Sequence, residues 1–487
     1  MLNYLKNALN HTTTENGAVT LRSSGNYCLD LFFRAGGMRD ADEAEIGRTV
    51  TRAYTENPAD TMKILFYIRD IRGGMGERRF FRIAMQTLAK AAPDAVRRNL
   101  CLFAEYGRYD DLCALFGTPC EADALALIAQ QFRRDIECLE KGETVSLLAK
   151  WLPSLNASSA ETRRAANRIA RALRMAHEEY RKTLSALRRR IDITENYLRT
   201  RDYSFDYAQQ PSGAMFKYHK AFSRNDGVRY ANYLRAVEEG KEAIHTAALF
   251  PYQIVRTAMQ SADAETRRSM DVMWRNLPDL SAANGNALAV VDGSGSMYAG
   301  GKKAVRAIDA AISLGIYFAE HNRGAFANHF ITFSQNPRLV EIKGADIHEK
   351  VRFCASFNEV ANTDLEAVFR LILMTAVQHR LPQSEMPERL FIISDMEFDR
   401  CVTGGTNQTL FDAMQRMYRR RGYTLPQVVF WNVASRHENI PVSAAKTGAA
   451  LVSGAAPSTF DLVMHGTLSP EQVMRNAIDN PRYAKVS

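Results

Sequence analysis

A short run of oxygen-bearing residues, Asp292-Gly293-Ser294-Gly295-Ser296-Met297, follows directly on the apolar run Ala287-Leu288-Ala289-Val290-Val291. The apolar run predicts a buried strand, and the glycines after it allow the backbone to turn sharply. One carboxylate and two hydroxyls are thereby presented on one short loop. Hard oxygen ligands of this kind are those that Mg²⁺ prefers. The sequence therefore predicts a divalent-cation site at the end of a strand.

Two further residues fall where an α/β sheet would bring them to this loop. Thr363 opens a predicted helix just after a loop, and Asp395 ends the apolar run Leu390-Phe391-Ile392-Ile393-Ser394. Ligands of open α/β sheets bind beyond the carboxyl ends of the strands. The predicted metal site therefore comprises Asp292, Ser294, Ser296, Thr363 and Asp395.

From about residue 285, short apolar runs alternate with helical patterns, which is typical of a doubly wound α/β domain. We expect this domain to span residues 285–487, with strands at 287–291, 329–333, 338–342, 390–394, 427–432 and 449–453. Helices are expected near 303–321, 363–378, 409–420 and 470–478.

Residues 1–284 show helix after helix with short polar or glycine connectors and little strand patterning. This pattern predicts a separate all-α domain built from antiparallel helix pairs. A chain of 487 residues is also too long for one hydrophobic core.

Positive charge is concentrated in the helical half of the chain. The net charge is +9, and residues 161–201 alone hold 12 Lys or Arg against 5 Asp or Glu. Apolar residues recur there at steps of three and four, which predicts one face of a long helix. The basic side chains are either a solvated helix face or a ridge that contacts phosphates. The candidate RNA contacts are Arg164, Arg168, Arg171, Arg174, Arg181, Lys182, Arg188 and Arg189.

A glycine-rich loop at 73–76 is flanked by arginines, including Arg72 and Arg78. Backbone amides at a helix start, together with arginines, can hold a phosphate. The loop lacks the lysine and hydroxyl residue of a nucleotide-binding P-loop. A tight helix connector with Arg–Asp pairing is the alternative.

Other classes of protein are disfavoured by composition. The seven cysteines never form a Cys-x-x-Cys pair, and no His-Glu-x-x-His is present, so neither a disulfide framework nor a zinc enzyme is indicated. Apolar content is 46%, and no apolar stretch approaches the length of a membrane span. We expect a cytoplasmic protein with no membrane partner.

The order Asp-x-Ser-x-Ser, then Thr, then Asp resembles the metal-ion-dependent adhesion site of von Willebrand factor A domains. This resemblance implies that Ser294, Ser296 and Thr363 bind the metal directly, while Asp292 and Asp395 act directly or through water. The implied ion is Mg²⁺, or another divalent cation such as Mn²⁺ or Ca²⁺. Its open coordination position implies capture of an acidic side chain from a partner.

A helical region followed by such a domain resembles the Ro autoantigen family, with its TROVE module, and more closely the bacterial and plant relatives of unassigned function. The residues that support the closer match are Tyr67-Ile68-Arg69-Asp70-Ile71-Arg72-Gly73-Gly74, Leu147-Leu148-Ala149-Lys150-Trp151-Leu152-Pro153-Ser154, Tyr180-Arg181-Lys182, Phe250-Pro251-Tyr252-Gln253-Ile254-Val255 and Ser394-Asp395-Met396-Glu397-Phe398-Asp399. The resemblance implies a ring of HEAT-like helix pairs closed by the A domain, which binds small structured RNA.

Three functions follow as hypotheses. The first is a non-catalytic RNA-binding scaffold whose A domain binds acidic ligands through Mg²⁺. The second is a protein-interaction module without RNA binding. The third is a metal-dependent phosphoesterase, which the sequence favours least because no second acidic cluster near Asp292 supplies a two-metal site.

Overall fold

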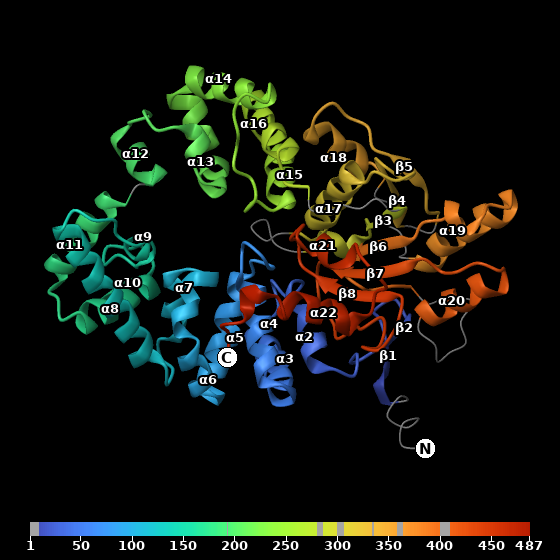
Figure 1. Ribbon diagram of the computed structural model, residues 1–487, viewed down its shortest axis with the longest axis horizontal. Helices are drawn as coiled ribbons and strands as arrows, with labels where there is room; N and C mark the ends of the chain where they lie inside the picture. Colours follow the sequence, from blue (N-terminus) through green and yellow to red (C-terminus); the bar gives the residue numbers. More distant parts are fainter. Residues whose placement is uncertain are drawn as a thin grey trace.

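The computed structural model describes residues 9–191, 193–279, 286–299, 306–333, 336–357, 364–399 and 410–487. Within them, a helical region precedes a six-stranded, mostly parallel sheet with helices (Figure 1). This order of parts confirms the predicted fold class, a helical array followed by a doubly wound α/β domain. It is also the arrangement that the resemblance to the Ro family implies.

The helical region consists mainly of short helices whose apolar faces pack together. In α3, Ile46, Val50 and Ala53 are buried at helical spacing, and the Asp42 side chain caps the start by accepting from Glu45 N. The helices are α2 (Tyr27–Ala35), α3 (Glu43–Glu56), α4 (Pro58–Arg69), α5 (Arg78–Ala91), α6 (Pro93–Arg98), α7 (Phe103–Tyr106), α8 (Glu121–Glu140), α9 (Leu148–Trp151), α10 (Ala160–Ala172), α11 (His177–Arg190), α12 (Thr194–Thr200), α13 (Ser212–Asn225), α14 (Gly227–Glu238), α15 (Pro251–Gln260) and α16 (Ala264–Arg275). Shorter 3₁₀ turns include η2 (Tyr109–Leu115).

The long basic helix predicted after residue 160 is instead two helices, α10 and α11. Arg174 has φ 57°, in the left-handed region, and Met175 N donates to Ala170 O at 3.0 Å. These features form a Schellman-type ending of α10. The prediction of one helix was wrong because apolar residues recur at steps of three and four in both helices. This spacing continues across the break, so the sequence pattern does not reveal it.

Two short strands at the N-terminus were also missed by the all-helical expectation. β1 (His11–Thr13) and β2 (Val19–Leu21) pair as an antiparallel hairpin. This hairpin packs on the α/β domain, where Leu21 bridges Ile440. Strands of three residues contain too few positions to show an alternating pattern.

The sheet has the strand order β5-β4-β3-β6-β7-β8, and all neighbours are parallel except β4 and β5. Its strands are β3 (Ala287–Asp292), β4 (His329–Phe333), β5 (Leu339–Glu341), β6 (Arg389–Ser394), β7 (Gln427–Asn432) and β8 (Ala449–Ser453). All six predicted strands are present. The helices of this domain are α17 (Ala307–His321), α18 (Ile347–Ala355), α19 (Leu365–His379), α20 (Leu410–Arg420), α21 (Thr459–Val463) and α22 (Pro470–Ile478).

Helices cover both faces of the sheet, as a doubly wound fold requires. Adjacent residues of β7 show this, because successive side chains of a strand point to opposite faces. Phe430 contacts Phe411 of α20, whereas Trp431 contacts Phe460 of α21. The helices α18 and α21 were not predicted from the sequence.

Both ends of the helical region pack on the α/β domain (Figure 1). At one end, α2 meets β8 so closely that a Cβ on Gly36 would lie 2.4 Å from Gly454 N. At the other end, α15 and α16 pack on α17 and α18, and Asp271 accepts a hydrogen bond from Ile347 N at 2.9 Å. The helical region therefore leaves the α/β domain and returns to it.

The glycine-rich loop that follows α4 is a packed connector. A Cβ on Gly74 would lie 1.9 Å from Tyr67 O, so the loop closes against the helix before it. Asp70, at the end of α4, accepts from Tyr483 Oη at 3.0 Å and pairs with Arg482. Of the two interpretations of this loop, the connector with Arg–Asp pairing matches these contacts.

Candidate functional site

Polar side chains form a row along the carboxyl edge of the sheet. Ser394, Asn432 and Ser453 are paired across β6, β7 and β8. The β3–β6 register pairs Val291 with Ile393, which places Asp292 beside Ser394. The predicted site thus begins at the strand ends, as expected for an open α/β sheet.

Asp292 is fully buried and both of its carboxylate oxygens accept hydrogen bonds. Ser294 N donates to Oδ1 at 2.9 Å, and Ser394 Oγ donates to Oδ2 at 2.6 Å. Ser394 is a positioning residue that sequence reasoning missed. Its place immediately before Asp395 at a strand end was the available signal.

Four of the five predicted metal-site residues come together in the structure. Ser294 Oγ and Ser296 Oγ lie 3.0 Å apart, and Ser296 lies close enough to Asp395 to lower the pKa of that carboxyl group. Asp395 and Asp292 are close enough for their charges to interact. Thr363, the fifth residue, lies outside the described residues.

Two buried carboxyl groups at one place are electrostatically unfavourable without a cation. Burial raises the pKa of Asp292 to about 7, and the charge of Asp395 contributes to the rise. Burial also raises the pKa of Asp395, although Ser296 and Arg436 oppose this shift. Carboxylate and hydroxyl oxygens grouped in this way match the ligand chemistry of Mg²⁺ or Mn²⁺.

Arg436 connects this group to the N-terminal hairpin. Its Nη2 lies 3.1 Å from Asp395 Oδ2 and 2.9 Å from Glu15 Oε2. Arg436 lies on the loop after β7, and Glu15 lies in the turn between β1 and β2. Sequence reasoning missed both residues, because only the fold brings them together.

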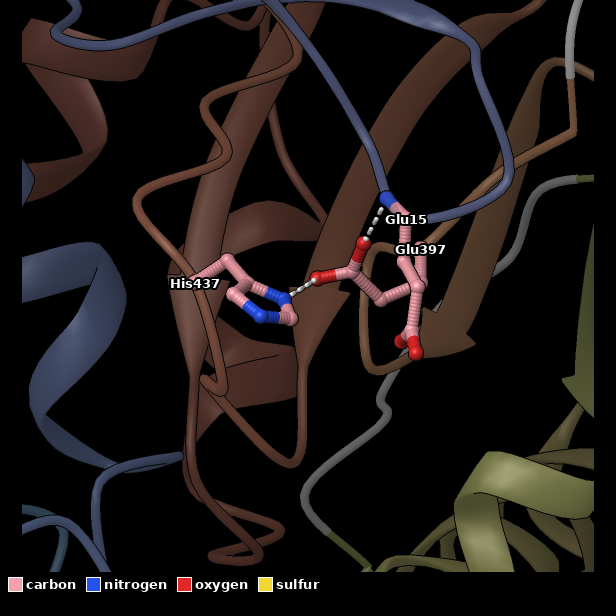
Figure 2. Close-up of side chains that lie close together, drawn as sticks. All are labelled: Glu15, Glu397 and His437. Carbon is pink, nitrogen blue, oxygen red and sulfur yellow. Dashed lines mark hydrogen bonds and ion pairs between the residues drawn. The ribbon is translucent and has the colours of Figure 1, made fainter.

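Glu397 fastens the same hairpin to the domain (Figure 2). Its Oε2 accepts from Glu15 N at 2.7 Å, and its Oε1 accepts from His437 Nδ1 and Asn439 Nδ2, each at 2.8 Å. Glu15, Glu397 and His437 have the residue types of a metal site. Both oxygens of Glu397 accept hydrogen bonds here, so the group acts in this structure as a clasp between the hairpin and the domain.

The predicted RNA contacts fall into two groups. Within the described residues, several already bind the protein itself. Arg188 donates to Ala149 O, Leu152 O and Ser154 Oγ, Arg168 pairs with Glu121 at 2.6 Å, and Lys182 pairs with Glu178 at 2.8 Å. The remaining candidates are exposed; these are Arg72, Arg78, Arg164, Arg171, Arg174, Arg181 and Arg189.

Two parts of the chain match family models that are described without a function. Residues 286–482 match the model of a domain of unknown function (DUF7788), and residues 14–116 and 157–285 match that of another (DUF2828). An uncharacterized protein of Acanthamoeba polyphaga mimivirus, L728, is 28% identical over 499 residues, which cover 94% of this chain and 85% of the viral protein.

Among solved structures, the Ro (RSR) protein of Deinococcus radiodurans aligns with 94% of this chain and 100% of its own chain. The TM-score is 0.40 and the sequence identity is 13%. Among the described residues, no helix is long and apolar enough to cross a membrane.

Proposed function

We propose that this protein is a non-catalytic binding scaffold whose α/β domain holds a divalent cation and captures an acidic ligand through it. The observation that supports this proposal most strongly is the convergence of Ser294, Ser296 and Asp395 beside the buried Asp292. Thr363 is proposed as the fifth member of the site. Mg²⁺ is the proposed ion, with Mn²⁺ or Ca²⁺ as alternatives.

An acidic ligand follows from the charge of the proposed donor set. Two carboxylates and neutral hydroxyls leave the ion with little surplus negative charge around it. Mg²⁺ keeps open positions for water or for an incoming oxygen ligand. A carboxylate from a partner would complete the coordination shell as a hard oxygen ligand.

The residues around the proposed cation site favour capture of an acidic ligand over catalysis. Glu397 and Asp395 lie close together in sequence, but Glu397 accepts hydrogen bonds from Glu15 N of the hairpin and from His437 and Asn439 of the loop after β7. Its carboxylate therefore already serves to hold the hairpin to the α/β domain. A two-metal phosphoester mechanism requires further free carboxylates near the first ion.

Isothermal titration with Mn²⁺ tests the cation site. We expect one Mn²⁺ per chain for the natural protein and a loss of affinity of at least about tenfold for the Ser294→Ala, Ser296→Ala double variant, because two direct oxygen ligands are lost. Ser313→Ala is a matched control, since Ser313 is a buried serine of α17. Unchanged Mn²⁺ affinity in the double variant would contradict the proposal.

The acidic ligand is tested with a glutamate-containing peptide in the presence of Mg²⁺ or of a chelator. Capture is expected only with the ion, and it should be absent when glutamine replaces the glutamate in the peptide. Hydrolysis of a phosphoester by the Mg²⁺-loaded protein, lost on Asp292→Asn, would favour the enzyme hypothesis instead.

A second candidate function is RNA binding by the helical region. The observation that favours it is the row of Arg164, Arg168 and Arg171 on α10, spaced so that all three lie along one face. Arginines that face solvent bind nucleic acid by contacting phosphates and releasing counterions. A small structured RNA is the proposed partner.

Filter binding at two salt concentrations tests this candidate. We expect RNA affinity that falls steeply with added salt and that falls again in the Arg164→Ala, Arg171→Ala double variant. Arg419→Ala, on the exposed surface of α20, is the control. Absence of RNA binding at low salt would contradict this candidate function, and only the protein-interaction hypothesis would remain.

A further inference from the structure

The helical region contains a cavity that the cation site does not involve. Its volume is about 600 Å³, within the range of pockets that bind small ligands. It lies between α5 and α10, with η2 and the end of α9 in its wall. Five arginines line it, namely Arg78, Arg79, Arg82, Arg164 and Arg168, against the three acids Glu43, Asp110 and Glu161.

Two acidic residues of η2 are already paired with arginines. These are Asp110, which lines the cavity, and its buried neighbour Asp111. Arg82 bonds Asp110 at 2.8 Å and Asp111 at 2.6 Å. Arg108 bonds Asp110 at 2.7 Å, and Arg69 bonds Asp111 at 2.7 Å. Three guanidinium groups therefore share two carboxylates. These two carboxylates have no excess negative charge with which to pair a fourth arginine.

Arg78 and Arg164 are lining arginines with no hydrogen bond or ion pair among the described residues. Arg78 adjoins the cluster of arginines and aspartates just described. Partial burial lowers the pKa of Arg78, and the positive charges of Arg108 and Arg82 lower it further, whereas Asp110 and Asp111 oppose the shift. An anion placed beside Arg78 would offset the remaining repulsion from Arg108 and Arg82.

An aromatic surface adjoins the surplus charge. Trp151 forms part of the wall, and the Arg108 guanidinium carbon lies 3.9 Å from the centroid of a Trp151 ring. Aromatic rings and guanidinium planes are the surfaces on which unpaired nucleobases stack. The cavity thus combines a site for a phosphate with a site for a base.

We propose that this cavity binds the terminal phosphate of a nucleotide or oligonucleotide, with the phosphate between Arg78 and Arg164 and the attached nucleoside against Trp151 and Arg108. A phosphate monoester carries up to two negative charges, which matches the two unpaired arginines. The proposal deepens RNA binding, the second candidate function, and is tested separately from it.

Fluorescence anisotropy with a 3′-labelled octaribonucleotide provides the test. The same sequence is compared with a 5′-phosphate and with a 5′-hydroxyl. For the natural protein we expect the phosphorylated form to bind at least about tenfold more tightly, because two charge-assisted contacts are gained. The preference should vanish in the Arg78→Ala, Arg164→Ala double variant and persist in Arg224→Ala, an exposed arginine of α13.

Competition by adenosine monophosphate distinguishes the two sources of a terminal phosphate. Competition as strong as that of the unlabelled oligonucleotide identifies a free nucleotide, and competition at least about a hundredfold weaker identifies an RNA end. Equal displacement by phosphoserine would show that no nucleoside is recognised and would overturn the proposal.

The remaining outcomes separate this proposal from general RNA binding. Equal, salt-dependent binding of both octamers would leave RNA binding intact and overturn the terminal-phosphate site. The natural protein could also bind adenosine monophosphate but neither octamer. If the double variant then lost adenosine monophosphate binding, the result would support the site and contradict RNA binding. A full 5′-phosphate preference in a folded double variant would place the contact elsewhere and overturn the assignment of Arg78 and Arg164.

Discussion

At the scale of single residues, the proposed cation site depends on a buried carboxyl group that does not ionise readily on its own. The pKa of Asp292 is raised to about 7 by burial and by Asp395. Because this folded-state pKa exceeds the unfolded one, the metal-free protein loses stability from this group as the pH rises from about 4 through 7. A bound cation reverses the loss, since it binds the ionised form.

We therefore predict that stabilisation by Mg²⁺ increases with pH. Below pH 7 the ion must displace a proton from the site, and affinity should fall by up to about tenfold per pH unit. Thermal unfolding with and without Mg²⁺ at pH 6 and pH 8 measures the effect. A larger shift of the melting temperature at pH 6 than at pH 8 would contradict it.

A second residue-scale prediction concerns Asp111, which is completely buried between arginines. It accepts from Arg69 at 2.7 Å and from Arg82 at 2.6 Å. Asp111→Ala leaves buried positive charge unpaired, so we expect the free energy of unfolding to fall by about 3–5 kcal/mol. In urea denaturation, the control Asp94→Ala should change it by no more than about 1 kcal/mol, because that side chain is 80% exposed.

The site residues that could be predicted from the sequence are those at the ends of strands. Asp292 and Asp395 were predictable because each directly follows a buried run, and Ser294 because it lies two residues after Asp292. Arg436 and Glu15 were not, since their contacts join segments about 400 residues apart in the chain. Surface arginines were predicted only in part, because a sequence does not show that Arg188 bonds backbone carbonyls of a neighbouring helix.

At the scale of elements, strands were the more predictable part of this chain. β4, β7 and β8 have the bounds that the apolar runs indicated, because strands buried on both faces are continuously apolar. The break between α10 and α11 was not predictable, since Arg174 adopts the left-handed conformation without glycine. The helices α18 and α21 are short, and short helices give little periodic signal.

The contact between α2 and β8 provides a test of element packing. A Cβ on Gly36 would lie 2.4 Å from Gly454 N and 2.6 Å from Gly454 Cα. Because backbone atoms cannot rotate away, Gly36→Ala should destabilise the protein by about 1–3 kcal/mol. Differential scanning calorimetry would measure the change.

The matched substitution is Gly213→Ala in α13, where an added Cβ meets nothing within 4 Å. Alanine has the higher helix propensity and reduces the freedom of the unfolded chain, so this variant should gain up to about 1 kcal/mol. Equal effects of the two substitutions would show that α2 does not pack on β8 as described.

At the scale of the whole molecule, the helical region and the α/β domain support each other at several points. The N-terminal hairpin is clasped by Glu397, and the last turn of the chain packs into the helical region. There, Tyr483 stacks on Tyr106 at 5.5 Å and meets Tyr67 edge-on at 5.9 Å. The two parts are therefore expected to unfold together.

Tyr483→Ala tests this coupling, because Tyr483 is buried and bonds Asp70 through its hydroxyl. The space left by the missing tyrosine ring should lower the free energy of unfolding by about 3–5 kcal/mol. Hydrogen exchange should then quicken in α4 and α7 of the helical region as well as near the substitution. Tyr27→Ala, at a residue 43% exposed, should leave exchange unchanged; effects confined to the C-terminal turn would argue against coupling.

The central claim is that a divalent cation binds between the Ser294–Ser296 loop, Thr363 and Asp395. The most direct measurement is the anomalous diffraction of a crystal of the full chain grown with Mn²⁺. We predict one strong peak per chain within about 2.0–2.3 Å of the Ser294 and Ser296 hydroxyl oxygens. A peak at Glu15, Glu397 and His437 instead, or no peak at the strand ends, would contradict the account.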